Sequence, residues 1–135
     1  IKSSILKISP SICYEIAYPS LINQSAINSN ILVTISNDTW FGSSIGPEQH
    51  LQLAKDRVLE HQKPLLRSTN SGISAIIDHR GNILGKQEYF EEKTLKGRVV
   101  LQEGNTPYNH LGNSILYFYI SIMMVVSLLI KRNKV

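Results

Sequence analysis

The sequence predicts an α/β fold followed by one C-terminal transmembrane helix. In the first half, short β-branched runs alternate with segments of helical periodicity, which is typical of α/β proteins. In the second half, strand-like runs follow one another with turn residues between them. The last part contains 17 consecutive residues without a charge, residues 114–130. A length of 135 residues therefore suits one small soluble domain and this apolar segment.

The first predicted strand ends at the single cysteine of the chain. Apolar residues at near-alternating positions indicate a strand over residues 5–12, directly before Cys13. Apolar residues at helical spacing, with Pro19 near the first turn, then predict a short helix over residues 19–29. We therefore expect Cys13 at an elbow between a strand and a helix.

A second strand and a second helix are predicted next. The β-branched run at residues 31–36 is too short for a separate helix and is typical of a buried strand. It leads into a polar loop at residues 37–42. From residue 46 to about residue 62, apolar residues recur on one face and charged residues lie elsewhere, which predicts an amphipathic helix.

Further strands complete the predicted domain. They cover residues 65–68, 73–78, 83–87 and 95–102, with turns at residues 70–72 and 80–82. In folds that alternate strands and helices, ligands bind at the carboxyl ends of the strands. The loops that follow the first strands are therefore the expected place for a site.

The uncharged C-terminal run predicts a helix that crosses a membrane, because residues 114–130 span roughly 25 Å as a helix. A buried core helix or an interfacial helix is the alternative, but a polar face is missing. Lys131, Arg132 and Lys134 follow the run, so the positive-inside rule places the C-terminus in the cytoplasm and the domain on the periplasmic side. The predicted boundaries are 1–112 for the soluble domain, 113–131 for the span and 132–135 for the tail.

Charge and cysteine content exclude several classes of function. The net charge is +4, but the three cations of the tail leave only +1 for residues 1–130, so a basic surface for nucleic acid is not expected. A single cysteine excludes a disulfide within the chain and a multi-thiolate metal site. The histidines do not have metal-ligand spacing, and we expect no metal and no cofactor. They are His50, His61, His79 and His110.

An elbow would give Cys13 the geometry of a nucleophile. The backbone N–H of Tyr14 would then be able to bind an oxyanion. The alternative is that Cys13 is a small buried apolar residue. A thiol also needs a base or a cation nearby to ionise, and the sequence places none of the histidines beside Cys13. Cys13 is therefore either inert or activated by groups that precede Ile1.

Several motifs, in order, resemble the carbon–nitrogen hydrolase domain of apolipoprotein N-acyltransferases. The strongest are Ile-Cys-Tyr-Glu-Ile at residues 12–16 and Ser-Asn-Asp-Thr-Trp-Phe-Gly at residues 36–42. The match continues through residues 46–50, 67–74, 78–81 and 104–108. The order of these motifs and the terminal apolar helix make a chance similarity implausible.

The resemblance implies a fold and a reaction. The fold is part of a nitrilase-type four-layer α-β-β-α sandwich, and the catalytic triad is Glu-Lys-Cys. Cys13 is the one triad member in this chain, so the resemblance implies an acyltransferase whose Glu and Lys lie upstream, and residues 1–112 as the C-terminal part of its domain. Cys13 would take an acyl group from a phospholipid as a thioester and pass it to the diacylglyceryl-cysteine of an apolipoprotein, at the bacterial inner membrane.

The resemblance also assigns roles around Cys13. Tyr14 would supply the backbone oxyanion donor, and Glu15 would support the elbow or a nearby cation. The alternative for Glu15 is a solvated surface acid. The expected substrate-binding residues are Asn37, Asp38, Trp40, Phe41, Arg67, Thr69 and Asn70. For these residues, turn hydrogen bonds and core packing are the alternative.

Two other functions stay open at this point. A generic nitrilase-superfamily amidase would share Cys13 but has no use for residues 114–130. A catalytically inactive, membrane-tethered fragment would retain the fold without the missing Glu and Lys. A glutamate and a lysine at strand ends upstream of Ile1 would separate the enzyme from the inactive fragment.

Overall fold

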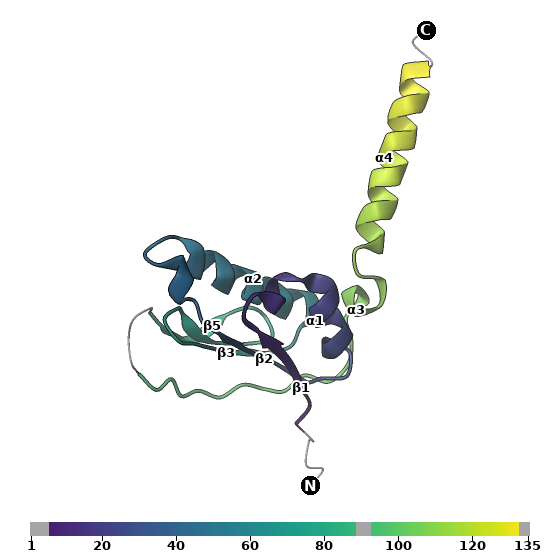
Figure 1. The fold of residues 1–135 in the computed structure, drawn as a ribbon. Coiled ribbons are helices and arrows are strands. Elements are labelled where there is room, and N and C mark those ends of the chain that lie inside the picture. The colour runs from purple at the N-terminus through teal and green to yellow at the C-terminus, as the bar shows by residue number, and fades with distance from the viewer. Residues whose placement is uncertain (1–5, 89–92, 133–135) are drawn as a thin grey trace.

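The computed structural model describes residues 6–88 and 93–132 of the chain. A single sheet with helices on one face forms the soluble part, and α4 (Ser114–Arg132) extends from it as a rod (Figure 1). The strands lie in the order β1-β2-β3-β4-β5. The predicted α/β class is therefore confirmed.

Three parallel strands bring their carboxyl ends to one edge of the sheet. β1 (Ile8–Ile12), β2 (Ile31–Ser36) and β3 (Leu65–Thr69) are parallel neighbours. β4 (Ser74–Ile77) and β5 (Ile83–Gln87) continue the sheet as antiparallel strands. The loops after β1, β2 and β3 consequently lie side by side, as the sequence predicts for the site.

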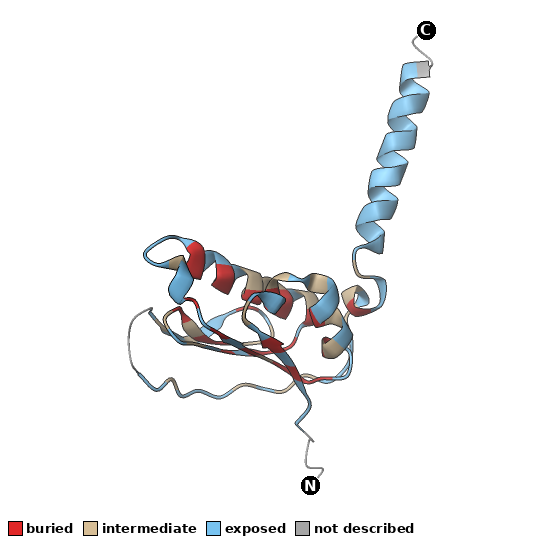
Figure 2. Cartoon of the chain, in the orientation of Figure 1, coloured by how far each residue is buried: buried red, intermediate tan, exposed pale blue. Residues whose placement is uncertain are grey.

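Two helices cover one face of the sheet and enclose the core (Figures 1 and 2). They are α1 (Pro19–Ala26) and α2 (Gly46–His61), and each has a proline in its first turn. The core between the helices and the sheet consists of aliphatic and alanine side chains: Ile16, Ile22, Ala26, Leu32, Leu51, Ala54, Val58, Leu65, Ile73, Ala75 and Ile77. Because α2 has apolar positions at a spacing of four residues, one side of it is buried and the other faces solvent.

Helix α1 ends three residues before the predicted end at Ser29. The side chains of Ser29 and Lys63 both donate to the carbonyl of Ala26. These donors satisfy a carbonyl that the last turn of a helix leaves without a partner. A lysine from the segment before β3 thus fixes where α1 stops.

The opposite face of the sheet is apolar and largely uncovered. Strand alternation sends Ser9 and Ser11 toward the helices and the isoleucines of β1 toward this open face. Ile12 and Ile35 are paired neighbours there and are 61% and 54% exposed. A sandwich with a second sheet would cover such a face, as the resemblance implies.

The predicted strand over residues 95–102 is wrong, because this stretch contains no strand. It runs along the open face, where Leu95 lies near Gly85 and Gly97 lies near the side chain of Ile76. A segment that lies over the face of a sheet cannot join its hydrogen-bond ladder. The strand-like composition of residues 95–102 therefore reflects packing onto the sheet and not pairing within it.

A polar cluster attaches the base of α4 to the domain. Helix α3 (Pro107–Leu111) begins at Thr106, whose hydroxyl caps it, and its Asn109 is buried. The Asn109 side-chain amide donates to Asn23 Oδ1 at 3.0 Å and lies 2.9 Å from His61 Nδ1. Asn109 thus links α1, α2 and α3, and α4 starts directly after this junction.

Helix α4 is long and apolar enough to cross a membrane. The stretch Ser114–Lys131 has a mean hydropathy of 2.0, and none of it is buried against the domain. The predicted tail over residues 132–135 begins inside this helix, and Lys134 and Val135 lie outside the described residues. The predicted domain boundaries stay predictions.

The buried His61 makes stability depend on pH. Burial, helped by the charges of Lys63 and Arg57, lowers its pKa from 6.5 to about 4, and the bond to Asn109 opposes the shift. Since the unfolded chain takes up this proton more readily, the contribution is complete above pH 6.5 and is lost as the pH falls toward 4. We expect a loss of up to about 3 kcal/mol over this range.

This pH dependence is measured by urea denaturation in detergent micelles, followed by circular dichroism. The variant His61→Gln should flatten the dependence, and the exposed His110→Gln is the matched control, which should leave it as in the parent chain. An equal slope in the parent chain and the His61→Gln variant would contradict the assignment.

Candidate active site

Cys13 has a left-handed backbone at the end of β1. Its φ is 53°, and among the described residues only Cys13 and Gln62 have a positive φ without being glycine. Gln62 is the C-cap of α2, and a left-handed residue at that position is a common way for a helix to end. At Cys13, by contrast, the strand turns at once into the 3₁₀ helix η1 (Cys13–Ala17). This conformation costs about 1–2 kcal/mol, so neighbouring groups must hold it.

Glu15 is one of the groups that hold the elbow. Its Oε2 accepts a hydrogen bond from the backbone N–H of Ile12 at 2.7 Å. This bond closes the turn on itself across Cys13 and satisfies an N–H at the start of η1. Of the interpretations open for Glu15, the geometry favours support of the elbow.

A buried charged cluster lies beneath the elbow, between the sheet and α2. Asp38 Oδ2 accepts from Arg67 Nη2 at 2.7 Å, and Asp38 Oδ1 accepts from Ser36 Oγ at 2.5 Å. Asp38 Oδ1 also lies 3.0 Å from His50 Nδ1. Gly72 is required opposite Asp38, because a Cβ at residue 72 would lie 2.2 Å from Asp38 Oδ2. The ends of β2 and β3 and the first turns of α2 meet in this cluster.

The charges of the cluster are balanced by hydrogen bonds. Burial alone would raise the pKa of Asp38, but the bonds from His50 and Ser36 and the charge of Arg67 outweigh burial, and the pKa is lowered. Asp38 is therefore ionised and can only accept hydrogen bonds. Arg67 Nε donates to the carbonyl of Ile73, which fixes the guanidinium on a second side.

The His50 ring reaches from this cluster to the elbow. His50 is 1% exposed, and its Nε2 lies 3.3 Å from the carbonyl oxygen of Cys13. The rings of Tyr14 and Phe41 lie at 5.8 and 5.7 Å from the imidazole, between ring centroids. His50 is not among the site residues predicted from the sequence. A signal was present, since residues 50, 54 and 58 share the buried side of α2.

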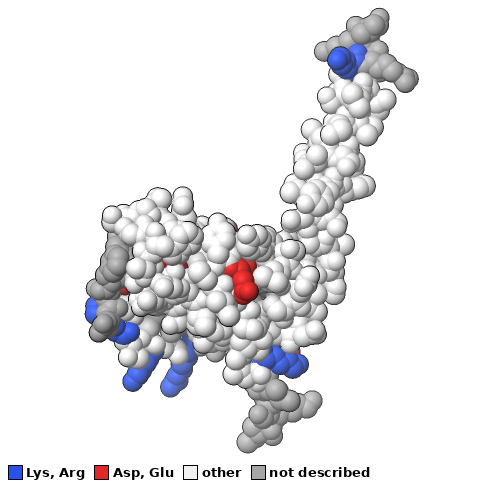
Figure 3. Space-filling model, viewed as in Figure 1, with Lys and Arg blue, Asp and Glu red and all other residues white. Residues whose placement is uncertain are grey.

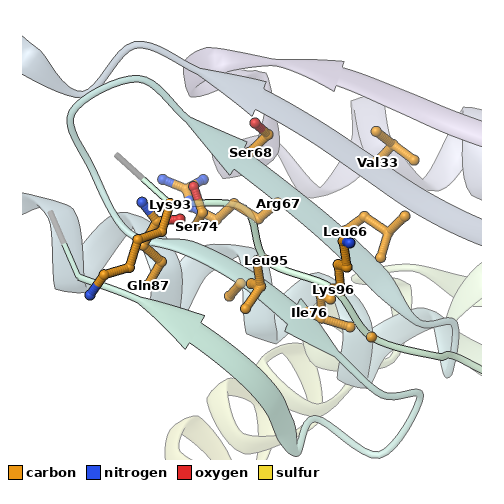
Figure 4. A pocket seen from close by; sticks show the side chains of 12 residues that line it. Val33, Leu66, Arg67, Ser68, Ser74, Ile76, Gln87, Lys93, Leu95 and Lys96 are labelled. Atoms are coloured by element: carbon orange, nitrogen blue, oxygen red, sulfur yellow. The ribbon is translucent and has the colours of Figure 1, made fainter. Parts of the chain in front are cut away.

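The face of Cys13 opens into a hollow at the sheet edge. The hollow has a volume of about 310 Å³ and is lined by Ile12, Cys13, Ile35, Ser36 and Asn37. A second hollow of about 430 Å³ lies under residues 93–97 and contains Leu66, Ile76 and Leu95 but not Cys13 (Figure 4). Asn37 is thus the predicted binding residue that shares a hollow with the thiol.

The other predicted binding residues divide into exposed and buried groups. Trp40 is 67% exposed and stacks on Phe41 with ring centroids 4.5 Å apart. Asn70 is exposed, while the backbone N–H of Thr69 donates to the hydroxyl of Ser74 at the end of β3. Asp38 and Arg67 are both buried and bonded to each other, so they lie beneath the site instead of on its wall.

The described residues 6–88 and 93–132 contain no group of three His, Cys, Asp or Glu side chains arranged to hold a metal ion. The elbow brings together a thiol, backbone N–H groups and a buried imidazole. This set suits nucleophilic acyl transfer once a base is supplied.

The chain is similar to known proteins over almost its whole length. The profile of the carbon–nitrogen hydrolase family matches residues 1–106. The apolipoprotein N-acyltransferase of Photobacterium profundum is 42% identical over 135 residues, which cover 99% of this chain and 26% of that protein. The one of Haemophilus influenzae is 49% identical over 110 residues, covering 81% and 21%. The chain thus spans about a quarter of the length of these relatives.

Solved structures show the same fold at low sequence identity. A carbon–nitrogen hydrolase from Helicobacter pylori G27 superposes with a TM-score of 0.55 at 17% identity, covering 68% of this chain and 40% of that chain. An amidase from Nesterenkonia sp. superposes with a TM-score of 0.51 at 16% identity, covering 66% and 36%. In both cases the match covers less than half of the solved chain.

The buried ion pair predicts a large and non-additive stability effect. Arg67→Met leaves the Asp38 carboxylate buried without its cation and should lower the free energy of unfolding by about 3–5 kcal/mol. The double variant Asp38→Asn, Arg67→Met removes both charges and should be destabilised less than Arg67→Met alone. Urea denaturation followed by circular dichroism measures the free energy of unfolding of both variants. A double variant that is less stable than Arg67→Met would contradict the pairing.

Proposed function

The chain belongs to the carbon–nitrogen hydrolase family, and we propose that it supplies the nucleophile of a membrane-bound apolipoprotein N-acyltransferase. The observation that carries the proposal is the left-handed elbow at Cys13, joined to a C-terminal helix able to cross a membrane. The identity to named acyltransferases over nearly the whole chain supports the same function.

The proposed reaction proceeds in two steps through Cys13. The thiolate attacks the ester carbonyl of a phospholipid, the tetrahedral oxyanion collapses, and the lysophospholipid leaves as an alcohol after taking up a proton. The α-amine of a diacylglyceryl-cysteine then attacks the Cys13 thioester, loses a proton and forms the amide, which returns the thiol. A thioester suits this role because an amine attacks it readily.

The proposed oxyanion donor is the backbone N–H of Tyr14. Cys13 and Tyr14 open the first turn of η1, where N–H groups have no acceptor within the helix. Such donors are worth most where water is excluded. In this role Tyr14 acts through its backbone, and its ring packs beside His50.

The base and the charge that activate the thiol are proposed to come from outside the chain. The hollow at Cys13 lies on the open face of the sheet, where Ile12 and Ile35 are exposed. A second sheet placed on this face would cover both isoleucines and could bring the Glu and Lys of the family triad over the thiol. Residues 1–135 are thus proposed to be an incomplete enzyme by themselves.

The substrate contacts proposed for this chain divide by exposure. Asn37 lines the same hollow as the thiol, and the stacked Trp40 and Phe41 offer apolar surface to an acyl chain. Thr69 and Asn70 lie at the end of β3, on the same edge of the sheet. Asp38 and Arg67 are proposed to support the site from beneath, because both are buried.

The proposed membrane orientation uses the distribution of charge. On the face drawn in Figure 3, cations gather on the side of the domain away from α4, and Lys131 lies at the far end of α4. Trp40 and Ile45 are both 67% exposed. We place α4 across the bacterial inner membrane, with the domain on the periplasmic side and the C-terminus in the cytoplasm.

Loss of Cys13 should abolish turnover. The test replaces the matching quarter of the Photobacterium profundum relative with this chain and assays acyl transfer from phospholipid to a diacylated lipopeptide. Cys13→Ala should lose at least about 10³-fold in turnover, because no other group can carry the acyl chain. Ser11→Ala, at a buried position of β1, is the control for folding. Turnover that survives Cys13→Ala would refute the assignment.

Thiol labelling tests the topology, because Cys13 is the single cysteine of the chain. In spheroplasts, a membrane-impermeant maleimide should label Cys13 without permeabilisation. The matched variant moves the thiol to the other end with Cys13→Ala and Lys134→Cys, and it should be labelled only after permeabilisation. The opposite pattern would show that the domain lies in the cytoplasm.

A further inference from the structure

We propose that His50 orients the oxyanion donor, by holding the carbonyl of the peptide unit to which that donor belongs. The inference rests on the proposed function, since it assumes that Cys13 is the nucleophile and the Tyr14 N–H the donor. It adds a positioning residue that touches neither the thiol nor the substrate.

The peptide bond between Cys13 and Tyr14 couples the orientation of two groups. The carbonyl of Cys13 and the N–H of Tyr14 belong to one planar unit and point in opposite directions when the bond is trans. No cis peptide bond occurs among the described residues. A group that fixes the direction of the Cys13 carbonyl therefore fixes the direction of the Tyr14 N–H. His50 Nε2, at 3.3 Å from that carbonyl oxygen, is such a group.

The direction is the productive one. His50 belongs to α2, which covers the helix face of the sheet, whereas the hollow beside Cys13 includes Ile12 and Ile35 of the open face. A carbonyl that points to His50 turns the N–H of the same peptide away from α2. The imidazole thus holds the donor toward the side from which a substrate carbonyl would approach.

The role proposed for His50 needs a hydrogen on Nε2. His50 Nδ1 lies 3.0 Å from Asp38 Oδ1 and 3.1 Å from Arg67 Nη2. In the imidazolium, Nδ1–H donates to Asp38. In the neutral Nε2–H tautomer, Nδ1 accepts from Arg67, but its lone pair also faces the Asp38 carboxylate. Both states donate from Nε2 to the Cys13 carbonyl. Only the neutral Nδ1–H tautomer would place a lone pair against that oxygen.

The cluster beneath the ring explains how the position is held. Asp38 is fixed by Ser36 and Arg67, and Arg67 is fixed in turn by the carbonyl of Ile73. The ring is fully buried, so it has no freedom to rotate away. A hydrogen bond donated to a carbonyl also polarises the N–H of the same peptide, which makes it a better donor.

The same contacts exclude His50 as the base that deprotonates Cys13. Its Nε2 faces the backbone carbonyl, and its Nδ1 faces Asp38 and Arg67. Neither ring nitrogen is left for the thiol. The effect of His50 on catalysis is therefore expected in the stabilisation of the oxyanion.

Two variants of His50 differ in which ring nitrogen their side-chain amide replaces. Glutamine places an amide N–H near the position of Nε2, and asparagine places one near the position of Nδ1. In the chimaera with the Photobacterium profundum relative, His50→Asn should lower kcat by on the order of 10²-fold with KM unchanged, as removal of an oxyanion donor does. His50→Gln should retain most of the parent kcat. Equal losses in the two variants, or a loss confined to KM, would overturn the proposal.

A spectroscopic measurement separates this proposal from the proposed function. In the 135-residue chain, labelled with ¹⁵N and held in micelles, the ring nitrogens of His50 and the amide of Tyr14 are observed by NMR. We expect a protonated Nε2, and a shift of the Tyr14 amide in His50→Asn that is absent in His50→Gln. A neutral Nδ1–H tautomer would refute the role of His50 even if Cys13 carries the acyl group. An active Cys13→Ala would instead refute the proposed function, while a protonated Nε2 would still support the hydrogen bond from His50 to the Cys13 carbonyl.

Discussion

The left-handed backbone at Cys13 is the constraint on which the site depends. A residue with a Cβ adopts this conformation at a cost in free energy. The conformation persists only where several neighbouring groups hold it in place. Here Glu15 bonds back across the turn to Ile12, and His50 lies against the Cys13 carbonyl. Because β1 runs parallel to β2 and β3, the elbow also lies at the edge where the next two loops begin. The fold thus holds the thiol of Cys13 at this edge of the sheet.

The ion pair beneath the elbow is better explained by position than by stability. Taking Asp38 and Arg67 out of water costs several kcal/mol per ion, and a well-packed apolar pair often does as well. Asp38, however, joins the end of β2 to β3 through Arg67 and to α2 through His50. Three elements are therefore held in one register around Cys13. We interpret the pair as a rigid support that fixes the geometry of the site, although burying the two charges costs free energy.

Local patterns predicted most of the fold, and long-range contacts account for what they missed. β1, β2, α2 and the elbow follow from periodicity and chain order, which short windows contain. The stretch at 95–102 has the composition of a strand but lies across the sheet face, a choice that only distant residues decide. His50 was missed for the same reason: its partners are 12, 17 and 37 positions away in sequence. Asp38 and Arg67 were placed near the right edge, but their mutual pairing, and hence their burial, is not visible in the sequence.

The uncovered sheet face and the exposed elbow at Cys13 have one common explanation. A quarter-length match to complete acyltransferases, an open hollow at Cys13 and exposed isoleucines around it are all expected of one half of a sandwich. The central claim is that Cys13 carries the acyl group between donor and acceptor. Mass spectrometry of the peptide that contains Cys13, from the chimaera purified out of growing cells without acceptor, tests it most directly. The account predicts a fatty-acyl mass on Cys13 that hydroxylamine removes; an unmodified Cys13 beside an acyl group on another residue would contradict it.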